Sequence, residues 1–308
     1  MTSTNWAYVS NYMVYSAMAV YTLAMISAAL EVAMNIKGAK ILVTSSGQSA
    51  TEPASDPDGG KSERWGRIAI SLTSLAFVLH LAAVIARAVS AHRVPWGNMY
   101  EFSTTGSVAV TGMFLLLLRR HSLRWLTLVV TFAVLMTLGT AITLLYRPSA
   151  PLVPALKSTW LVIHVSAAVI SGGVFLLANA VAAAYLYMER IESRGPRPLW
   201  AAKIPSLEVL DRLCYRLVAF VFPLWTFAVI AGAIWAESAW GRYWGWDPKE
   251  TWAFITWVAY AAYLHARATA GWKGKRAAWL CLLAGSSFLF NYVYVNVWGT
   301  GKHTYSGL

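Results

Sequence analysis

The sequence carries little charge: Asp, Glu, Lys and Arg make up 12% of its 308 residues, whereas hydrophobic residues make up 58%. Soluble domains carry about twice that share of charged residues, so this composition excludes an ordinary soluble protein. Only two cysteines are present, Cys214 and Cys281, which are far apart in sequence and form no Cys-x-x-Cys motif. They indicate neither a disulfide scaffold nor a thiol relay.

Acidic residues are scarcer than basic ones, with 13 Asp and Glu against 25 Lys and Arg and a formal net charge of +12. Such an excess is also typical of nucleic-acid-binding proteins. Here, however, the basic residues fall in short segments between long apolar runs, where Lys and Arg orient transmembrane helices. We therefore expect no nucleic-acid partner.

The long apolar runs predict an all-α, polytopic membrane protein with about eight transmembrane helices. A spanning helix needs about 20 mostly apolar residues. Runs of this kind occupy residues 12–34, 66–88, 103–118, 125–145, 160–188, 217–236, 252–270 and 278–298. If the N-terminus faces outward, most Lys and Arg residues fall in inner loops, as the positive-inside rule requires. Both termini are therefore expected on the outer face.

The chain divides into two membrane regions. Residues 1–156 hold the first four runs and a polar inner loop, 44–60, whose Pro, Gly and Ser content predicts disorder. Residues 157–308 hold the last four runs and an outer loop at 236–252. The first run lacks a preceding basic residue and is too long for a signal-peptide core, so we expect it to be retained.

The outer loop at 236–252 is the most informative stretch. It places aromatic and acidic side chains among glycines, namely Trp240, Trp244, Trp246, Asp247, Glu250 and Trp252. Asp247 is expected to cap the following helix, with Pro248 at its first position and Glu250 completing a capping box. Tryptophans on a glycine-rich loop suit a flat, largely apolar ligand such as a porphyrin. The alternative is an interfacial aromatic belt, which does not require neighbouring carboxylates.

Two histidines accompany this loop on the same side of the membrane. His164 lies about one turn inside the outer end of the fifth run, and His303 follows the eighth run. Neutral imidazoles fill the axial positions of haem iron well, so the pair favours a bis-histidine haem site. Arg242, Lys249 or Lys302 could pair with the propionates.

Two further histidines lie within the predicted spans. His265 is near the inner end of the seventh run, and His80 is near the middle of the second. An ionisable residue at the depth of His80 is either functional or hydrogen-bonded to a neighbouring helix. The sequence does not decide between these two interpretations.

The motif Trp240-Gly-x-x-Trp244-x-Trp246-Asp247-x-x-Glu250 resembles the signature of the tryptophan-rich "WWD" haem-handling proteins of cytochrome c maturation, relatives of CcmC and CcmF. The length, the number of spans and the tail from Gly299 to Tyr305 are most similar to the CcsA/ResC branch. The resemblance covers at least residues 157–308. In the first half it rests mainly on layout and on the stretch Pro95…Asn98…Glu101.

The resemblance implies that His164 and His303 ligate haem b, bound as a substrate, at the outer loop. It also implies that His265 is an intramembrane haem ligand whose opposite ligand comes from a ResB/Ccs1-type membrane partner. Haem would then be joined to the CxxCH motif of apocytochrome c, which makes the chain a subunit of a holocytochrome c synthase. Its place would be the bacterial plasma membrane, or the thylakoid membrane of a plastid. The resemblance supplies no certain catalytic residue and no role for His80.

Two other functions stay open at this point. A haem exporter without attachment activity would be expected to show broken helices and internal repeats, and neither is clear in the sequence. An electron-transfer subunit with a permanent b-type haem would place facing histidine pairs within helices. Two of the three candidate ligands here lie instead at outer ends.

Overall fold

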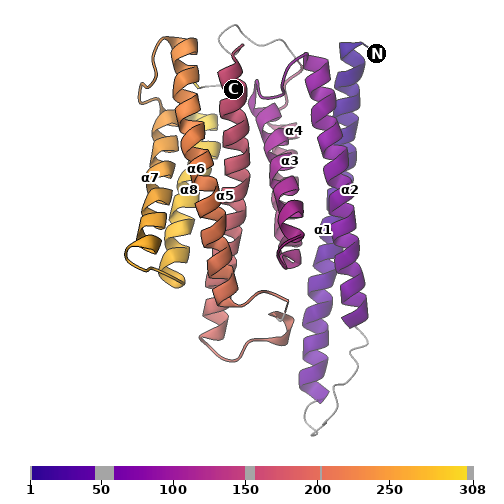
Figure 1. The fold of residues 1–308 in the computed structure, drawn as a ribbon. Helices are drawn as coiled ribbons and strands as arrows, with labels where there is room; N and C mark the ends of the chain where they lie inside the picture. Colours follow the sequence, from indigo (N-terminus) through magenta and orange to yellow (C-terminus); the bar gives the residue numbers. More distant parts are fainter. Residues whose placement is uncertain (1, 46–58, 150–156, 202, 304–308) are drawn as a thin grey trace.

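The computed structural model describes residues 2–45, 59–149, 157–201 and 203–303. Within these residues the fold is all-helical, and the helices form one elongated bundle (Figure 1). The helices are α1 (Ser3–Ser45), α2 (Gly59–Ala91), α3 (Met99–Leu118), α4 (Thr127–Thr143), α5 (Thr159–Glu192), α6 (Leu207–Trp240), α7 (Pro248–Ala268) and α8 (Lys275–Trp298). The predicted all-α polytopic fold is confirmed.

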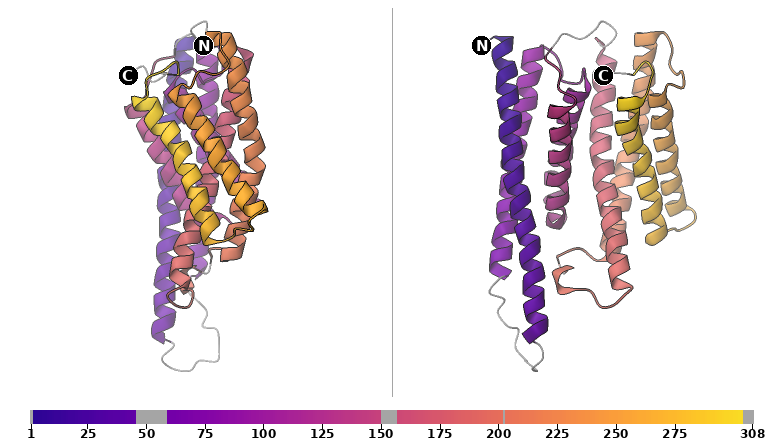
Figure 2. Two further views of the ribbon diagram at one scale, coloured as in Figure 1. Left: turned by 90° about the vertical axis from the view of Figure 1, so that its left-hand side faces the viewer. Right: turned by 180° about the vertical axis from the view of Figure 1, so that it is seen from behind.

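Among the described helices, seven are long and apolar enough to cross a membrane, namely α1 to α6 and α8. The chain is therefore an integral membrane protein. The remaining helix, α7, has the length of a span at 21 residues, but it is less apolar than the others. It lies beside α8 along the bundle (Figure 2). Apart from its ends, the predicted loop 44–60 lies outside the described residues.

Successive helices alternate in direction, so the start of α1 and the end of α8 lie at the same end of the bundle (Figure 1). We call this the tryptophan end, because it holds the α6–α7 loop. The opposite end is called the arginine end, because Arg119, Arg120 and Arg194 follow the helix termini there. The charge distribution predicts that the tryptophan end faces outward.

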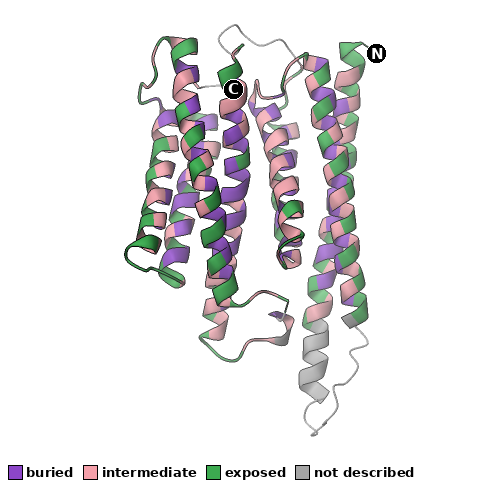
Figure 3. Ribbon diagram, in the orientation of Figure 1, coloured by how far each residue is buried: buried purple, intermediate pink, exposed green. Residues whose placement is uncertain are grey.

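Helix α5 is the centre of the bundle and packs against α3, α6 and α8. Buried residues concentrate on it, while the outer faces of the surrounding helices are exposed (Figure 3). Small residues allow neighbouring helices to approach closely in a membrane. At Gly172, for example, a Cβ atom would lie 2.5 Å from the Phe288 ring of α8. Close packing around α5 fixes the position of the side chains it carries.

The two cysteines meet in this core although they are far apart in sequence. The Sγ atoms of Cys214 in α6 and Cys281 in α8 lie 3.4 Å apart, and both residues are buried free thiols. The Tyr263 hydroxyl lies 3.7 Å from Cys214 Sγ. Their sequence spacing gave no sign of this contact, which arises because α7 returns the chain to the arginine end before α8 begins.

Candidate functional site

The α6–α7 loop at the tryptophan end is held together by its two carboxylates. Asp247 Oδ1 accepts from the backbone of Lys249 at 3.1 Å, and the Glu250 carboxylate accepts from the backbone of Gly245 at 2.8 Å and of Asp247 at 3.2 Å. The predicted capping box is present. Trp246 adopts a positive φ of 57°, which is unusual for a bulky residue and characteristic of functional loops.

Asp247 also binds the segment that follows α8. Its Oδ2 accepts from the backbone of Lys302 at 2.6 Å, and its Oδ1 lies 3.1 Å from Nδ1 of His303. A Cβ at Gly301 would lie 2.2 Å from Asp247 Oδ2, so this approach requires glycine. Burial tends to raise the pKa of Asp247. The hydrogen bond and charge of His303, together with the backbone donors, outweigh that effect and lower this pKa, so the carboxylate is ionised.

His164 is held on α5 against α6. Its Nδ1 lies 2.7 Å from the carbonyl oxygen of Ala228, and donates to it because a carbonyl can only accept. The ring lies over Gly232, where a Cβ would be 2.7 Å from His164 Cε1. A glycine at this position of α6 therefore creates the space for the imidazole.

Trp235 of α6 joins the two histidines. Its side chain is buried and lies nearly parallel to His164, with ring centroids 6.2 Å apart and an angle of 12°. It meets His303 edge-on at 5.8 Å and Trp240 at 4.8 Å. Trp240 in turn meets His303 at 4.6 Å. Sequence analysis missed Trp235 because it lies inside an apolar run, and its one signal was its position just before the loop.

A cavity of about 120 Å³ lies against this aromatic group. Both histidines line it, and its wall is built by residues of α5, α6 and α8 and by the starts of α3 and α7. Four buried polar atoms on the wall have no hydrogen-bond partner within the described chain, namely Nε1 of Trp96, Trp225 and Trp235 and Oδ1 of Asn291. Leaving buried polar atoms unpaired is costly. The wall is therefore suited to a ligand that carries polar groups, or to water, either of which would pair these atoms.

The loop before α3 brings Trp96 to the cavity. Glu101 is fully buried and binds Arg87 at 3.0 Å and Arg93 at 2.7 Å. Asn98 caps α3 by accepting from the backbone of Glu101 at 2.9 Å. Removing one partner from a buried ion pair is strongly destabilising, so this cluster fixes the loop and the tryptophan that it carries.

The other predicted tryptophans lie around the site. Trp244 lines a smaller adjoining cavity of about 50 Å³, which also touches His164 and His303. Trp246 is 66% exposed and meets Trp244 edge-on at 5.8 Å. Trp252 packs on Phe290, with ring centroids 4.1 Å apart. The loop thus presents one tryptophan at the surface and places others beside the histidines.

Three basic residues were predicted near the site, and Lys249 is the one that lines both cavities. Its Nζ lies 2.5 Å from Asn296 Oδ1. Arg242 instead lies 3.7 Å from Glu250, and Lys302 is exposed and contributes its backbone N–H to Asp247.

The remaining histidines lie elsewhere. His265 is exposed on the last turns of α7, about 25 Å along the helix from the loop at 1.5 Å per residue. His80 is buried in α2, where its ring meets Tyr21 edge-on at 6.0 Å. The structure therefore brings two of the three predicted iron ligands together and places the third at the arginine end.

Known proteins resemble this chain in sequence and in fold. Residues 96–303 match the model of the family described as Cytochrome C assembly protein. A "Cytochrome c biogenesis protein CcsA" of Synechococcus sp. (strain JA-3-3Ab) is 34% identical, and the alignment covers 78% of this chain and 89% of that protein. A protein of the same name from Guillardia theta is 43% identical over 53% of this chain and 59% of its own length.

A solved structure, "Cytochrome c Heme Lyase CcmF", has a similar fold with a TM-score of 0.63 at 18% identity. The match covers 96% of this chain and 50% of that one, so this chain spans about half the length of that protein. The likeness concerns the helical fold. Together with the family match over the whole candidate site, these comparisons show that the chain belongs to the cytochrome c assembly protein family.

Proposed function

We propose that the protein binds haem between His164 and His303 at the tryptophan end and presents it for covalent attachment to apocytochrome c. Membership of the cytochrome c assembly family supports a role in cytochrome c maturation. The local geometry of the two histidines supports the specific role of holding haem.

The observation that carries the proposal is the hydrogen bonding of the two imidazoles. Nδ1 of His164 bonds a backbone carbonyl, and Nδ1 of His303 bonds the Asp247 carboxylate. Metal-ligating histidines almost always donate their second ring nitrogen to such an acceptor, which fixes the tautomer and orientation. Both rings also line the same cavity. We therefore assign Nε2 of each ring as the nitrogen that binds iron.

The size of the cavity indicates how haem enters. At about 120 Å³, it is smaller than the roughly 300–1,000 Å³ of pockets that enclose drug-sized ligands. We infer that the segment carrying His303 moves outward to admit the porphyrin. The contacts of His303 with Trp235 and Trp240 would then be replaced by contacts with the haem ring.

Each neighbouring residue has a role in this proposal. Trp235 and Trp240 orient the porphyrin plane, because indoles prefer stacked or edge-on contacts with other aromatic rings. Lys249 pairs with a propionate, which forms a charge-assisted hydrogen bond. Asp247 and Glu250 contribute to haem binding by holding the loop in place, and Asp247 also holds His303.

The attachment chemistry takes place on the haem vinyl groups. Each cysteine thiol of the CxxCH motif adds across one vinyl double bond, so one C–S bond and one C–H bond form without net oxidation. Haem with both vinyl groups intact is haem b, which would be the substrate. The protein contributes binding and orientation, which lower the entropic cost of bringing the reactants together.

A second haem station is proposed at His265. Its exposure on α7 suits a ligand that is shared with another membrane protein, for which we propose a ResB/Ccs1-type partner. In this scheme residues 157–308 form the haem-handling region, and residues 1–156 support it and contribute Trp96 to the cavity. The complex would work in a bacterial plasma membrane or a thylakoid membrane.

Absorption spectra of the purified complex test this proposal. Wild type, His164→Ala, His303→Ala and His265→Ala are co-expressed with the partner and an apocytochrome c, and covalent haem on the cytochrome is measured by haem staining. We expect a bis-histidine spectrum that the two outer variants alter together and the inner variant alters separately. A haem-free wild type under haem-replete expression would refute the site.

The same experiment separates the alternative functions. If the variants lose covalent cytochrome c but still deliver a normal amount of haem to the outer side of the membrane, the protein attaches haem in a step distinct from its transport. If wild type keeps one permanent haem and its loss leaves covalent cytochrome c unchanged, the chain is an electron-transfer subunit instead.

A further inference from the structure

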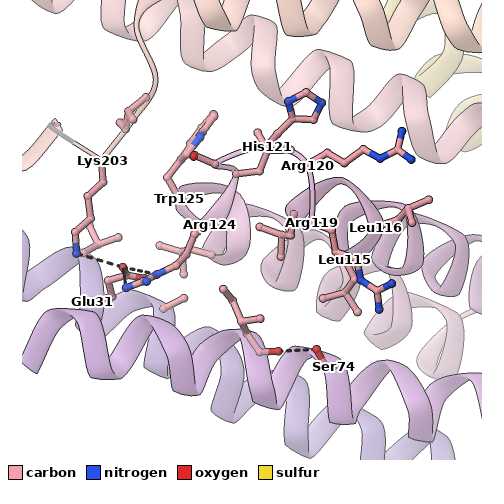
Figure 4. A pocket seen from close by; sticks show the side chains of 18 of the residues that line it. Glu31, Ser74, Leu115, Leu116, Arg119, Arg120, His121, Arg124, Trp125 and Lys203 are labelled. Atoms are coloured by element: carbon pink, nitrogen blue, oxygen red, sulfur yellow. Dashed lines mark hydrogen bonds and ion pairs between the residues drawn. The ribbon is translucent and has the colours of Figure 1, made fainter.

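A large cavity of about 1,170 Å³ lies at the arginine end (Figure 4), and neither His164 nor His303 lines it. Helices α1, α2, α3 and α4 and the connection between α5 and α6 build its walls. Nothing in the proposed haem chemistry at the tryptophan end uses it. The cavity has an apolar part and a charged part, which we describe in turn.

The apolar part is a groove between α2 and α3. Ile70, Phe77 and Val78 line it from α2, and Gly112 and Leu116 line it from α3. A Cβ at Gly112 would lie 3.0 Å from the Phe77 ring, so α2 and α3 pack closely at this end of the groove. Val78 is 59% exposed and Leu116 is 54% exposed. The groove therefore opens on the side of the bundle, where membrane lipid lies.

One group of charges in the cavity is internally neutral. Arg124 lies 2.6 Å from Glu31 and 2.5 Å from Glu63, and Lys203 Nζ lies 3.5 Å from Glu31. Two cations and two carboxylates therefore satisfy one another. This cluster ties α1, α2 and the short turn before α4 together and leaves no net charge for a ligand.

The other charged group is not neutralised. Arg119 and Arg120 directly follow α3 and line the same cavity. Both side chains are exposed, and neither makes an ion pair within the residues that the structure describes. In Figure 4 they lie on the side of Leu115 and Leu116, away from Glu31. The open apolar groove thus ends near two arginines that make no ion pair with any residue the structure describes.

We propose that this cavity binds an anionic phospholipid, with its phosphate on Arg119 and Arg120 and an acyl chain in the α2–α3 groove. The guanidinium group presents paired N–H donors that match phosphate oxygens. Basic pockets between transmembrane helices on the inner side are known to take acidic lipid headgroups. The charge excess selects an anionic lipid over a zwitterionic one, and the groove selects a lipid over free phosphate.

Native mass spectrometry of the full chain in detergent tests this site. The protein is titrated with phosphatidylglycerol or with phosphatidylcholine of the same acyl chains. We expect wild type to retain one phosphatidylglycerol and to bind phosphatidylcholine at least about tenfold more weakly. Each basic group at a membrane surface favours anionic lipid by about fivefold, so Arg119→Gln with Arg120→Gln should weaken phosphatidylglycerol binding by about 25-fold.

A matched control carries the same charge change at the same end of the bundle. Arg190 and Arg194 are exposed arginines at the end of α5 that do not line the cavity. Arg190→Gln with Arg194→Gln should leave the affinity for phosphatidylglycerol within about twofold of wild type. If both double variants weakened phosphatidylglycerol binding equally, the effect would come from general surface charge rather than from this cavity, and the proposal would be overturned.

A groove-filling variant tests the apolar part without changing charge. Ser74 lines the groove, and its hydroxyl bonds only the Ile70 carbonyl of its own helix. Ser74→Phe should therefore fold and weaken phosphatidylglycerol binding by about tenfold or more, by excluding the acyl chain. Unchanged binding would refute the groove.

Two competitors distinguish the lipid from other anions. Inorganic phosphate should fail to displace bound phosphatidylglycerol at equal concentration, because it gains nothing from the groove. Displacement of the lipid by added haem, lost in the Arg119/Arg120 variant, would make haem the occupant and overturn the proposal. His303→Ala should leave lipid binding unchanged, so this site and the proposed haem site succeed or fail separately.

Discussion

Replacing Asp247 with alanine should release the segment that carries His303 while leaving the helices assembled. The carboxylate accepts from the Lys302 backbone at 2.6 Å and from His303 Nδ1 at 3.1 Å. Hydrogen bonds to charged groups contribute about 1.5–3 kcal/mol each. The side chains of Asp247 and His303 are 5% and 12% exposed, so solvent screens them little. Losing both bonds should therefore cost about 3 kcal/mol or more. This lowers the equilibrium constant for docking of the segment that carries His303 by a factor of about 100.

The substitution also removes the cap of α7, which costs about 1 kcal/mol. Ser158→Ala serves as a control for that part. The Ser158 hydroxyl caps α5 by accepting from the Trp160 backbone at 3.2 Å, and it makes no contact with the segment that carries His303. Asp247→Asn should give an intermediate result, because it keeps one accepting oxygen but replaces the other with an NH2 donor and loses the charge.

Hydrogen–deuterium exchange of the peptide that contains residues 299–303 measures this release, and absorption spectra measure bound haem in the same samples. Asp247→Ala should accelerate exchange about 100-fold at these amides and lower the haem content as far as His303→Ala does. Exchange at the wild-type rate would refute the anchoring role, as would equal acceleration in Ser158→Ala.

The pH dependence of the same contact follows from the lowered pKa of Asp247. A group whose pKa is lower in the folded state stabilises that state above its unfolded pKa, which is about 3.9 for aspartate. The contribution is lost as the pH falls through the lower, folded value. Docking of the His303 segment through Asp247 should therefore be unchanged from neutral pH down to about pH 4 and be lost below it.

Two further predictions concern helix packing. Gly232→Ala places a methyl group 2.7 Å from His164 Cε1 and should displace the imidazole and change the haem spectrum. Gly139→Ala, where the same test finds open space, should keep the spectrum and raise stability by up to about 1 kcal/mol. Treating the membrane-embedded protein with an oxidant should join Cys214 and Cys281 in a disulfide, so that both free thiols disappear together. The remaining thiols are counted by alkylation after denaturation, and Cys214→Ser should retain one thiol. A wild type that keeps both thiols would contradict the 3.4 Å contact.

Several features of the fold could be predicted because they depend on neighbouring residues. Apolar length located the helices, and the spacing of Asp247, Pro248 and Glu250 located the start of α7. Helix boundaries were less well predicted. The apolar run at 217–236 lies within α6, which begins earlier, at Leu207, because a helix continues beyond the membrane until its hydrogen bonds are capped.

The candidate site was predicted only in part. Sequence placed His164 and His303 on one side of the membrane, but it could not show that Trp235 lies between them. It placed Asp247 in the tryptophan loop as a helix cap, but it could not show that this residue also contacts His303. The pairing of a helix cap with a distant histidine has no sequence signature, since it depends on how α8 returns to the loop.

The sequence by itself determined that this is a helical membrane protein with an ordered tryptophan loop, because hydrophobic length and helix capping act over a few residues. Tertiary structure alone decided which distant groups meet. Packing of α5 on α6 at Gly232 positions His164, the return of α8 brings His303 to Asp247, and the packing of α1 to α4 leaves a cavity that Arg119 and Arg120 line. These contacts join residues that lie far apart in the chain, and only the packed bundle brings them together.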